Sequence, residues 1–80
     1  MTQRQVEKKD PQKIREDFPI VDRVSGWFFR QSEVSNGAWL VEGTDLWGRV
    51  VSRQGGDPDE LLSECAADAE RIAAEAKRAV

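Results

Sequence analysis

The pattern of apolar and polar positions predicts a polar tail, a short helix, a group of strands and a long helix. Residues 1–9 are almost entirely polar, so burial cannot offset the entropy lost on ordering them. We expect a flexible tail there, followed by one small domain over residues 10–80. Asp10 and Pro11 predict a helix start, because Asp caps a helix N-terminus and proline fits the first helical position. This helix ends before Pro19.

The middle of the chain is rich in aromatic and β-branched residues, which favour strands. Asn36-Gly37 predicts a two-residue type I′ hairpin turn, and residues 45–48 predict a type I turn closed by a left-handed glycine. Together the turns indicate an antiparallel meander, with strands at residues 24–34, 38–44 and 49–54.

A two-residue loop at Asn36-Gly37 also predicts which side chains share a face of the sheet, because strand neighbours alternate between faces. Such a loop pairs Val34 with Trp39. The face expected to pack on the core then carries Phe28, Ser32, Val34, Trp39, Val41 and Val51. The opposite face carries Trp27, Phe29 and Leu40.

Gly55-Gly56 ends the third strand, and Asp57 followed by Pro58 predicts an N-cap and the first residue of a C-terminal helix. An apolar stripe with helical spacing follows, made of Leu61, Leu62, Cys65, Ala66, Ala69, Ile72, Ala73 and Ala76. The predicted fold class is therefore α+β. It consists of a three-stranded antiparallel meander covered on one face by a long C-terminal helix, with a short N-terminal helix in front (α-β-β-β-α).

Composition argues against an enzyme. The 80 residues include no histidine and one cysteine, so the usual metal-ligand sets and histidine acid–base chemistry are missing. Cys65 falls on the apolar stripe, where a thiol behaves as a small hydrophobe. Capping accounts for the spacing of Asp57, Asp59 and Glu60. We expect no catalytic residue, no cofactor and no metal. With no long apolar run and no signal pattern, we also expect a cytoplasmic protein without membrane contact.

Nucleic-acid binding is the alternative function. The β-β-β-α order is similar to that of double-stranded RNA-binding domains and of integrase arm-type DNA-binding domains. The RNA-binding family places a lysine cluster at the start of its last helix, where this chain has residues 57–60, Asp-Pro-Asp-Glu. The formal net charge of −3 also disfavours contact with phosphates. The alternative contacts would be Arg23, Arg30, Arg49 and Arg53, with Trp27 and Phe29 as stacking platforms.

Protein–protein interaction is the function that the pattern favours. Large apolar groups are expected on the uncovered sheet face, at Trp27 and Phe29, and on a turn, at Leu46 and Trp47. Tryptophan is enriched at binding hot spots. We expect a homodimer through the uncovered sheet face, with another protein as a further partner. Self-association would also add buried surface to a small core.

Overall fold

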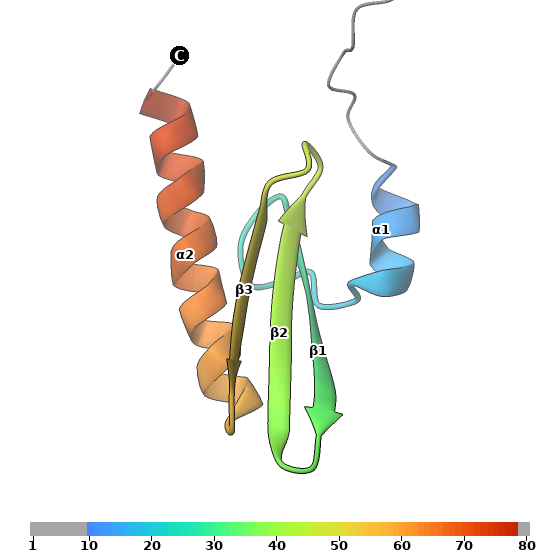
Figure 1. The fold of residues 1–80 in the computed structure, drawn as a ribbon. Coiled ribbons are helices and arrows are strands. Elements are labelled where there is room, and N and C mark those ends of the chain that lie inside the picture. The colour runs from blue at the N-terminus through green and yellow to red at the C-terminus, as the bar shows by residue number, and fades with distance from the viewer. Residues whose placement is uncertain (1–9, 79–80) are drawn as a thin grey trace, which may run out of the picture.

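The computed structural model describes residues 10–78 and confirms the α+β fold class. The elements are α1 (Pro11–Asp17), β1 (Trp27–Ser35), β2 (Ala38–Asp45), β3 (Val50–Gly55) and α2 (Pro58–Arg78). The strands form one antiparallel sheet in the order β1-β2-β3. The two helices lie on opposite sides of this sheet, α2 chiefly against β2 and β3, and α1 against β1 (Figure 1). The tail expected at residues 1–9 lies outside the described residues.

Both helices start where the sequence predicts. The Asp10 carboxylate accepts a hydrogen bond from the backbone N–H of Gln12 at 2.9 Å. The Asp57 carboxylate accepts hydrogen bonds from the backbone N–H groups of Asp59 at 3.1 Å and Glu60 at 3.4 Å. Each cap satisfies backbone donors that a first helical turn leaves without partners. No helix within residues 10–78 is long and apolar enough to cross a membrane.

The first hairpin turn differs from the predicted type I′ turn, and the difference changes the faces of β1. A type I′ turn needs positive φ at both central residues, but only Gly37 has positive φ, at 78°, and Asn36 does not. The register also shifts between Glu33 and Ser35. Trp39 therefore pairs with Glu33 instead of Val34. A one-residue shift moves every β1 side chain to the other face.

The predicted placement of Trp27 and Phe29 on an uncovered face is therefore wrong. Both side chains lie in the core beneath α2, where Trp27 is 2% exposed and Phe29 is 0% exposed. Their rings stack with centroids 6.4 Å apart. Val41 and Val51, which the sequence places on the core face, do lie in this core, and the half-buried Trp39 packs against it. The α2 contribution to the core is Leu61, Leu62, Cys65 and Ala69, as its stripe predicts.

Gly43 has a packing role in this core. It pairs with Phe29 across the β1–β2 ladder. A Cβ atom added at Gly43 would overlap the Phe29 ring and would lie 3.1 Å from a Val51 methyl group. The ring thus fills the space that a side chain at position 43 would need, as aromatic residues do beside glycines in strands.

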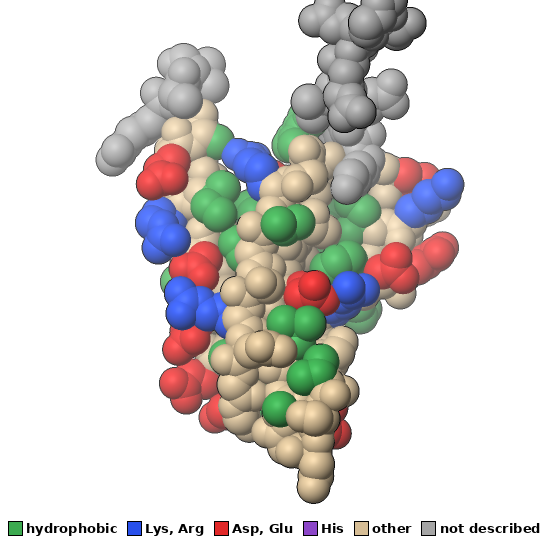
Figure 2. Space-filling view, in the orientation of Figure 1, with side chains coloured by type: hydrophobic (Ala, Val, Ile, Leu, Met, Phe, Trp, Pro, Cys, Tyr) green, Lys and Arg blue, Asp and Glu red, His purple; other side chains and the backbone are tan. Residues whose placement is uncertain are grey.

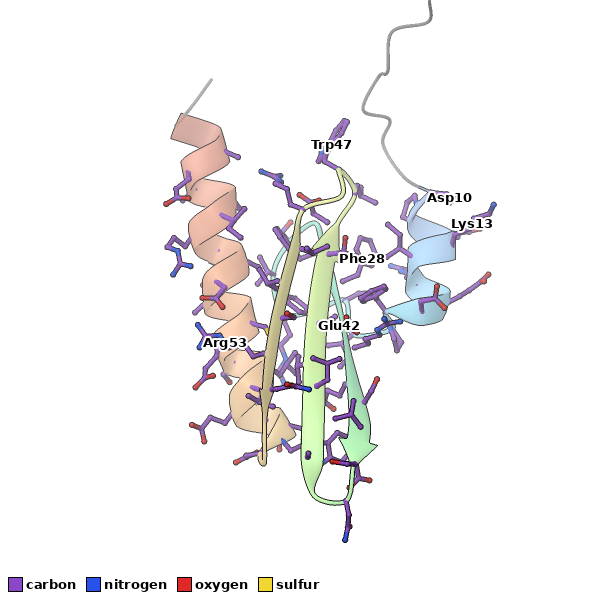
Figure 3. All side chains as sticks on the ribbon, viewed as in Figure 1. Asp10, Lys13, Phe28, Glu42, Trp47 and Arg53 are labelled. Atoms are coloured by element: carbon purple, nitrogen blue, oxygen red, sulfur yellow. The ribbon has the colours of Figure 1, made fainter. Side chains whose placement is uncertain are left out.

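Phe28 points away from α2, on the side of the sheet that faces α1 (Figure 3). The sequence places it on the core face, and the register shift explains this error. Phe28 and the α1 residue Ile14 are both buried. Ile20, just after α1, exchanges two backbone hydrogen bonds with Phe29, of 3.0 and 2.8 Å. The outer edge of β1 is thereby partly paired within the chain.

Candidate interaction surfaces

Three of the four arginines proposed as nucleic-acid contacts are held by carboxylates. Arg30 binds Glu42, with Nε 2.8 Å from Oε1, and its guanidinium lies 4.4 Å from the centre of the Phe18 ring. Arg49 donates through Nε to Asp45. Arg53 is bound by carboxylates of α2. The fourth, Arg23, is exposed in the segment between α1 and β1. The structure does not gather the four into one basic patch, because three of them serve separate contacts within the fold.

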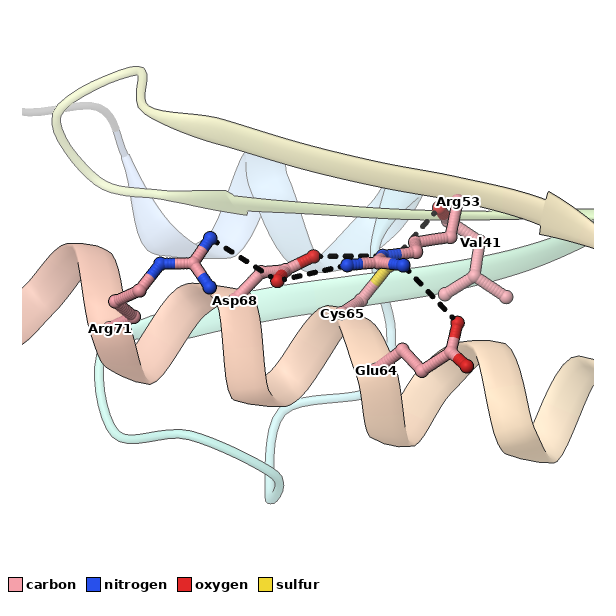
Figure 4. Close-up of polar contacts among 6 residues, drawn as sticks. All are labelled: Val41, Arg53, Glu64, Cys65, Asp68 and Arg71. Carbon is pink, nitrogen blue, oxygen red and sulfur yellow. Dashed lines mark hydrogen bonds and ion pairs between the residues drawn. The ribbon is translucent and has the colours of Figure 1, made fainter.

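Arg53 links β3 to α2 through a small ion-pair network (Figure 4). Its Nε and Nη2 atoms donate to the two carboxylate oxygens of Asp68 at 2.9 and 3.2 Å, and Nη1 lies 3.5 Å from Glu64. Arg71 contacts the same Asp68 carboxylate at 3.4 Å. The hydrogen bond from Arg53 holds the pKa of Asp68 below its ordinary value. The network thus directs the charge of Arg53 towards α2.

Cys65 lies in the centre of the core. Its side chain is fully buried, and Sγ donates to the backbone carbonyl of Val41 at 3.5 Å (Figure 4). Burial raises the pKa of the thiol to about 11. A thiol that stays protonated at neutral pH is a poor nucleophile. The position of Cys65 on the apolar stripe is therefore explained by packing.

The first surface that offers a contact to another molecule is the β3 surface. We define it as the outer backbone edge of β3 together with Leu40, Val50, Ser52 and Gln54. These side chains point away from α2, because they alternate with the core residues of β2 and β3. Among the helices and strands of residues 10–78, α1 contacts only β1 and α2 lies on the other face, so no helix covers this part of the sheet. Val50 is 69% exposed and Leu40 is half-buried.

The outer edge of β3 has few of the features that block pairing with another strand. Figure 2 shows a band of backbone and uncharged side chains along this part of the molecule, with charged side chains on both sides. β3 contains no proline, and its register with β2 runs without a bulge. Its one charged residue, Arg53, is held by Asp68. Edge strands usually carry such blocking features because a bare edge templates pairing.

The second surface is a hollow of about 150 Å³ between the β2–β3 turn and α2, here called the turn hollow. Its lining includes Ser25, Trp27, Leu46, Trp47, Arg49 and Ala73. Leu46 is half-buried and Trp47 is 50% exposed at the tip of the turn (Figure 3). Of the four predicted partner contacts, the structure therefore brings Leu46 and Trp47 to a surface and withdraws Trp27 and Phe29 into the core.

Asp45 shapes the turn hollow. Its buried carboxylate accepts hydrogen bonds from the backbone N–H groups of Trp47 and Arg49, each at 2.9 Å, and from Arg49 Nε. Gly48 closes the turn with a φ of 90°, which confirms the left-handed glycine that the sequence predicts. One carboxylate thus fixes both the backbone of the turn and the direction of the Arg49 side chain.

Several contributors to these surfaces were missing from the predicted contacts, and Val50 and Ala73 illustrate two reasons. Val50 had a signal in the sequence, because the third strand of a meander is an edge strand and Val50 alternates with the core residue Val51. The sequence gives no signal that Ala73 lies near Arg49 and Trp47, because that placement depends on how α2 crosses the sheet.

Comparison with known proteins adds no relative. No protein-family model matches the chain, and neither the curated proteins nor the solved structures contain a significant match to it.

Proposed function

We propose that this chain is a non-enzymatic protein-interaction domain that assembles as a homodimer through the β3 surface. One observation carries the proposal: the outer edge of β3 is regular and unpaired within the described residues, its one charged side chain is held by Asp68, and it borders the exposed side chain of Val50. An exposed edge of this kind forms main-chain hydrogen bonds with an added strand.

A second copy is the simplest partner for such an edge. Two β3 strands related by a two-fold axis are antiparallel. The free N–H groups of each edge then face the free carbonyl groups of the other. The six residues of β3 give a contact about 20 Å long at ~3.3 Å per residue. The result is a continuous six-stranded sheet, in which Val50 and Leu40 of both copies lie on one face.

The position of α2 is compatible with this arrangement. α2 packs over β2 and β3, so its axis lies roughly one strand spacing from the two-fold axis. Neighbouring strands are about 4.8 Å apart, which places the two α2 helices roughly 10 Å from each other. Packed helices lie about 8–10 Å apart. The two helices therefore meet along the seam without displacing the strands.

The charges beside the seam predict how the dimer responds to salt. Asp57, Glu60 and Glu64 lie beside the end of β3. Together with Asp68, these carboxylates outnumber the two arginines of the network, Arg53 and Arg71. Two such acidic groups repel each other, and salt screens that repulsion. Added salt should therefore strengthen the dimer. Nucleic-acid binding predicts the opposite trend, because counterion release weakens it as salt rises.

Light scattering coupled to size exclusion tests the dimer. We expect the mass to rise from about 9 kDa towards twice that value between roughly 10 μM and 1 mM, since a contact of this size is at the weak end of specific interfaces. Val50→Lys should keep the protein monomeric over this range. Val34→Lys is the matched control, because Val34 is also an exposed valine, at 49%, but lies on β1.

Hydrogen exchange at low and high protein concentration locates the contact. Backbone amides on the outer edge of β3 should become protected as concentration rises, while amides at the end of β1 near Val34 should not change. A protein that stays at 9 kDa at 1 mM contradicts the proposal. A dimer that forms equally well with Val50→Lys contradicts the assigned surface.

A further inference from the structure

We propose that the turn hollow is a binding site for the C-terminal residue of a partner protein, with an apolar side chain in the hollow and the terminal carboxylate on Arg49. The site shares no residue with the β3 surface. The proposal therefore stands or falls independently of the homodimer.

The size of the hollow limits what it can hold. Its volume of about 150 Å³ is well below the roughly 300–1,000 Å³ of pockets for small molecules. It has room for one side chain the size of leucine. Its apolar lining comes from Trp27, Leu46, Trp47 and Ala73, and its polar lining includes Ser25, Asp45 and Arg49.

Arg49 supplies the hydrogen-bond donors for a carboxylate, while Asp45, which also lines the hollow, balances its charge. Asp45 holds its Nε atom, and within residues 10–78 this is the only hydrogen bond that the guanidinium donates. Within the same residues the two terminal nitrogens of Arg49 have no hydrogen-bond partner, and the Asp45 contact restrains the guanidinium. A guanidinium presented in this way suits a carboxylate, which can accept two parallel hydrogen bonds from it.

The small hollow and the donors of Arg49 beside it together point to a chain terminus. A C-terminal residue carries its side chain and its carboxylate on the same Cα atom, so one residue reaches both the hollow and Arg49. An internal Asp or Glu carries its charge on a different residue from the apolar anchor, and a hollow of this size holds only one side chain. Capture of a terminal carboxylate is a known mode of peptide recognition.

The hollow also opens towards a place where a peptide can run. A neighbouring groove shares Ser25 and Ala73 with it and continues past Val24 and Ala74. The small side chains of Ala73 and Ala74 allow a peptide backbone to approach α2 closely. The residues that precede the terminal one would lie along this groove.

NMR titration with N-acetyl-L-leucine tests the site. This probe carries an apolar side chain beside a carboxylate, and N-acetyl-L-leucinamide is the same molecule without the charge. We expect the acid to shift the indole N–H signals of Trp27 and Trp47 with millimolar affinity, and the amide to bind at least 5-fold more weakly. In Arg49→Gln the two probes should bind equally.

A filled hollow provides the steric test. Ala73→Phe should weaken binding of N-acetyl-L-leucine at least 10-fold, whereas Ala67→Phe, on an exposed side of α2, should not change it. Each variant is checked for native dispersion of its amide spectrum. Absence of indole shifts, or equal binding of acid and amide by the unsubstituted protein, would overturn the proposal. Equally tight binding of N-acetyl-Asp-Leu-amide would overturn the assignment to a chain terminus.

Discussion

The two faces of the sheet carry similar apolar residues but are covered to different extents. On the α2 face, Trp27, Phe29 and Val41 are almost completely buried. On the α1 face only Phe28 is buried to a similar degree among the large apolar residues, while Val50 is 69% exposed. The difference in burial follows from the lengths of the two helices that cover the faces. At ~1.5 Å per residue, the 21 residues of α2 span roughly 32 Å and the seven of α1 roughly 11 Å.

This difference assigns separate roles to the two faces. The α2 face holds the fold together, because its residues contact each other across three strands and a helix. The α1 face leaves β2 and β3 free to contact another molecule. Four predictions sharpen this comparison, the first between the two faces and the others within the α2 side, and they follow from the largest expected effect to the smallest.

The largest effect should come from truncating the aromatic residues on either face. Phe29→Ala should lower the free energy of unfolding by about 3–5 kcal/mol, since it removes a fully buried ring and leaves a cavity. Much of the protein would then be unfolded, because small domains have only about 5–15 kcal/mol in total. Phe28→Ala should cost less, about 2–3 kcal/mol, because fewer elements surround it. Urea denaturation measures both. Equal losses would contradict the division between the faces.

Gly43→Ala tests the packing of Phe29 without removing an atom. The new methyl group overlaps the Phe29 ring, so the ring must move, and overpacking should cost about 2–3 kcal/mol. Gly56→Ala is the control, because a Cβ atom there meets only a backbone oxygen at 3.8 Å and the φ of Gly56 is not positive. It should change stability by less than about 0.5 kcal/mol. Similar effects from both would rule out the contact as the cause.

Cys65 should make the core sensitive to alkali. Burial raises the pKa of its thiol from 9.0 to about 11, so above pH 9 the unfolded chain loses a proton that the native protein keeps. This contribution to stability is complete below pH 9 and is lost as pH rises from 9 through about 11, by roughly 3 kcal/mol. Cys65→Ala should remove this part of the alkaline loss. Urea denaturation at pH 8, 9.5 and 11 measures it, and identical pH profiles for the two proteins would contradict burial of the thiol.

Asp68 should produce a smaller effect in acid. Its pKa is lowered by Arg53, so its contribution to stability is present above the pKa of the unfolded chain, near 4. This contribution is lost as pH falls through the lower pKa of the native state. Asp68→Asn should therefore flatten the acid part of the stability profile between pH 5 and 2, with Glu64→Gln as the neighbouring control. An unchanged acid limb in Asp68→Asn would show that the ion pair adds nothing.

The first hairpin shows where prediction from the sequence stopped. Asn36-Gly37 marked the turn correctly, but the same residue pair fits turns of different length. The choice between these turns sets the register of β1, and it depends on which register buries the larger rings. The observed register places Trp27 and Phe29 on the core side, where α2 covers both. A local sequence pattern cannot compare the burial in the two registers, since that burial depends on the packing of α2 against all three strands.

The second turn shows the opposite case. Asp45 and Gly48 specify its geometry through contacts within five residues, so the sequence alone predicted it. The caps at Asp10 and Asp57 were predictable for the same reason, as was the apolar stripe of α2. Leu46 and Trp47 were correctly expected at a surface because a turn at the end of a sheet has little to cover it.

Local chemistry, read from the sequence, thus determined the α-β-β-β-α order, the starts of both helices and the position of the turns, because hydrogen bonds and periodicity act between residues a few positions apart. Tertiary structure alone decided which face of β1 is buried, which arginines are held by carboxylates, and the meeting of Arg49, Trp47 and Ala73 at one hollow. Those outcomes depend on how a helix and a sheet distant in sequence pack against each other. A shift of one residue in register moves every side chain of a strand from the buried face to the exposed face.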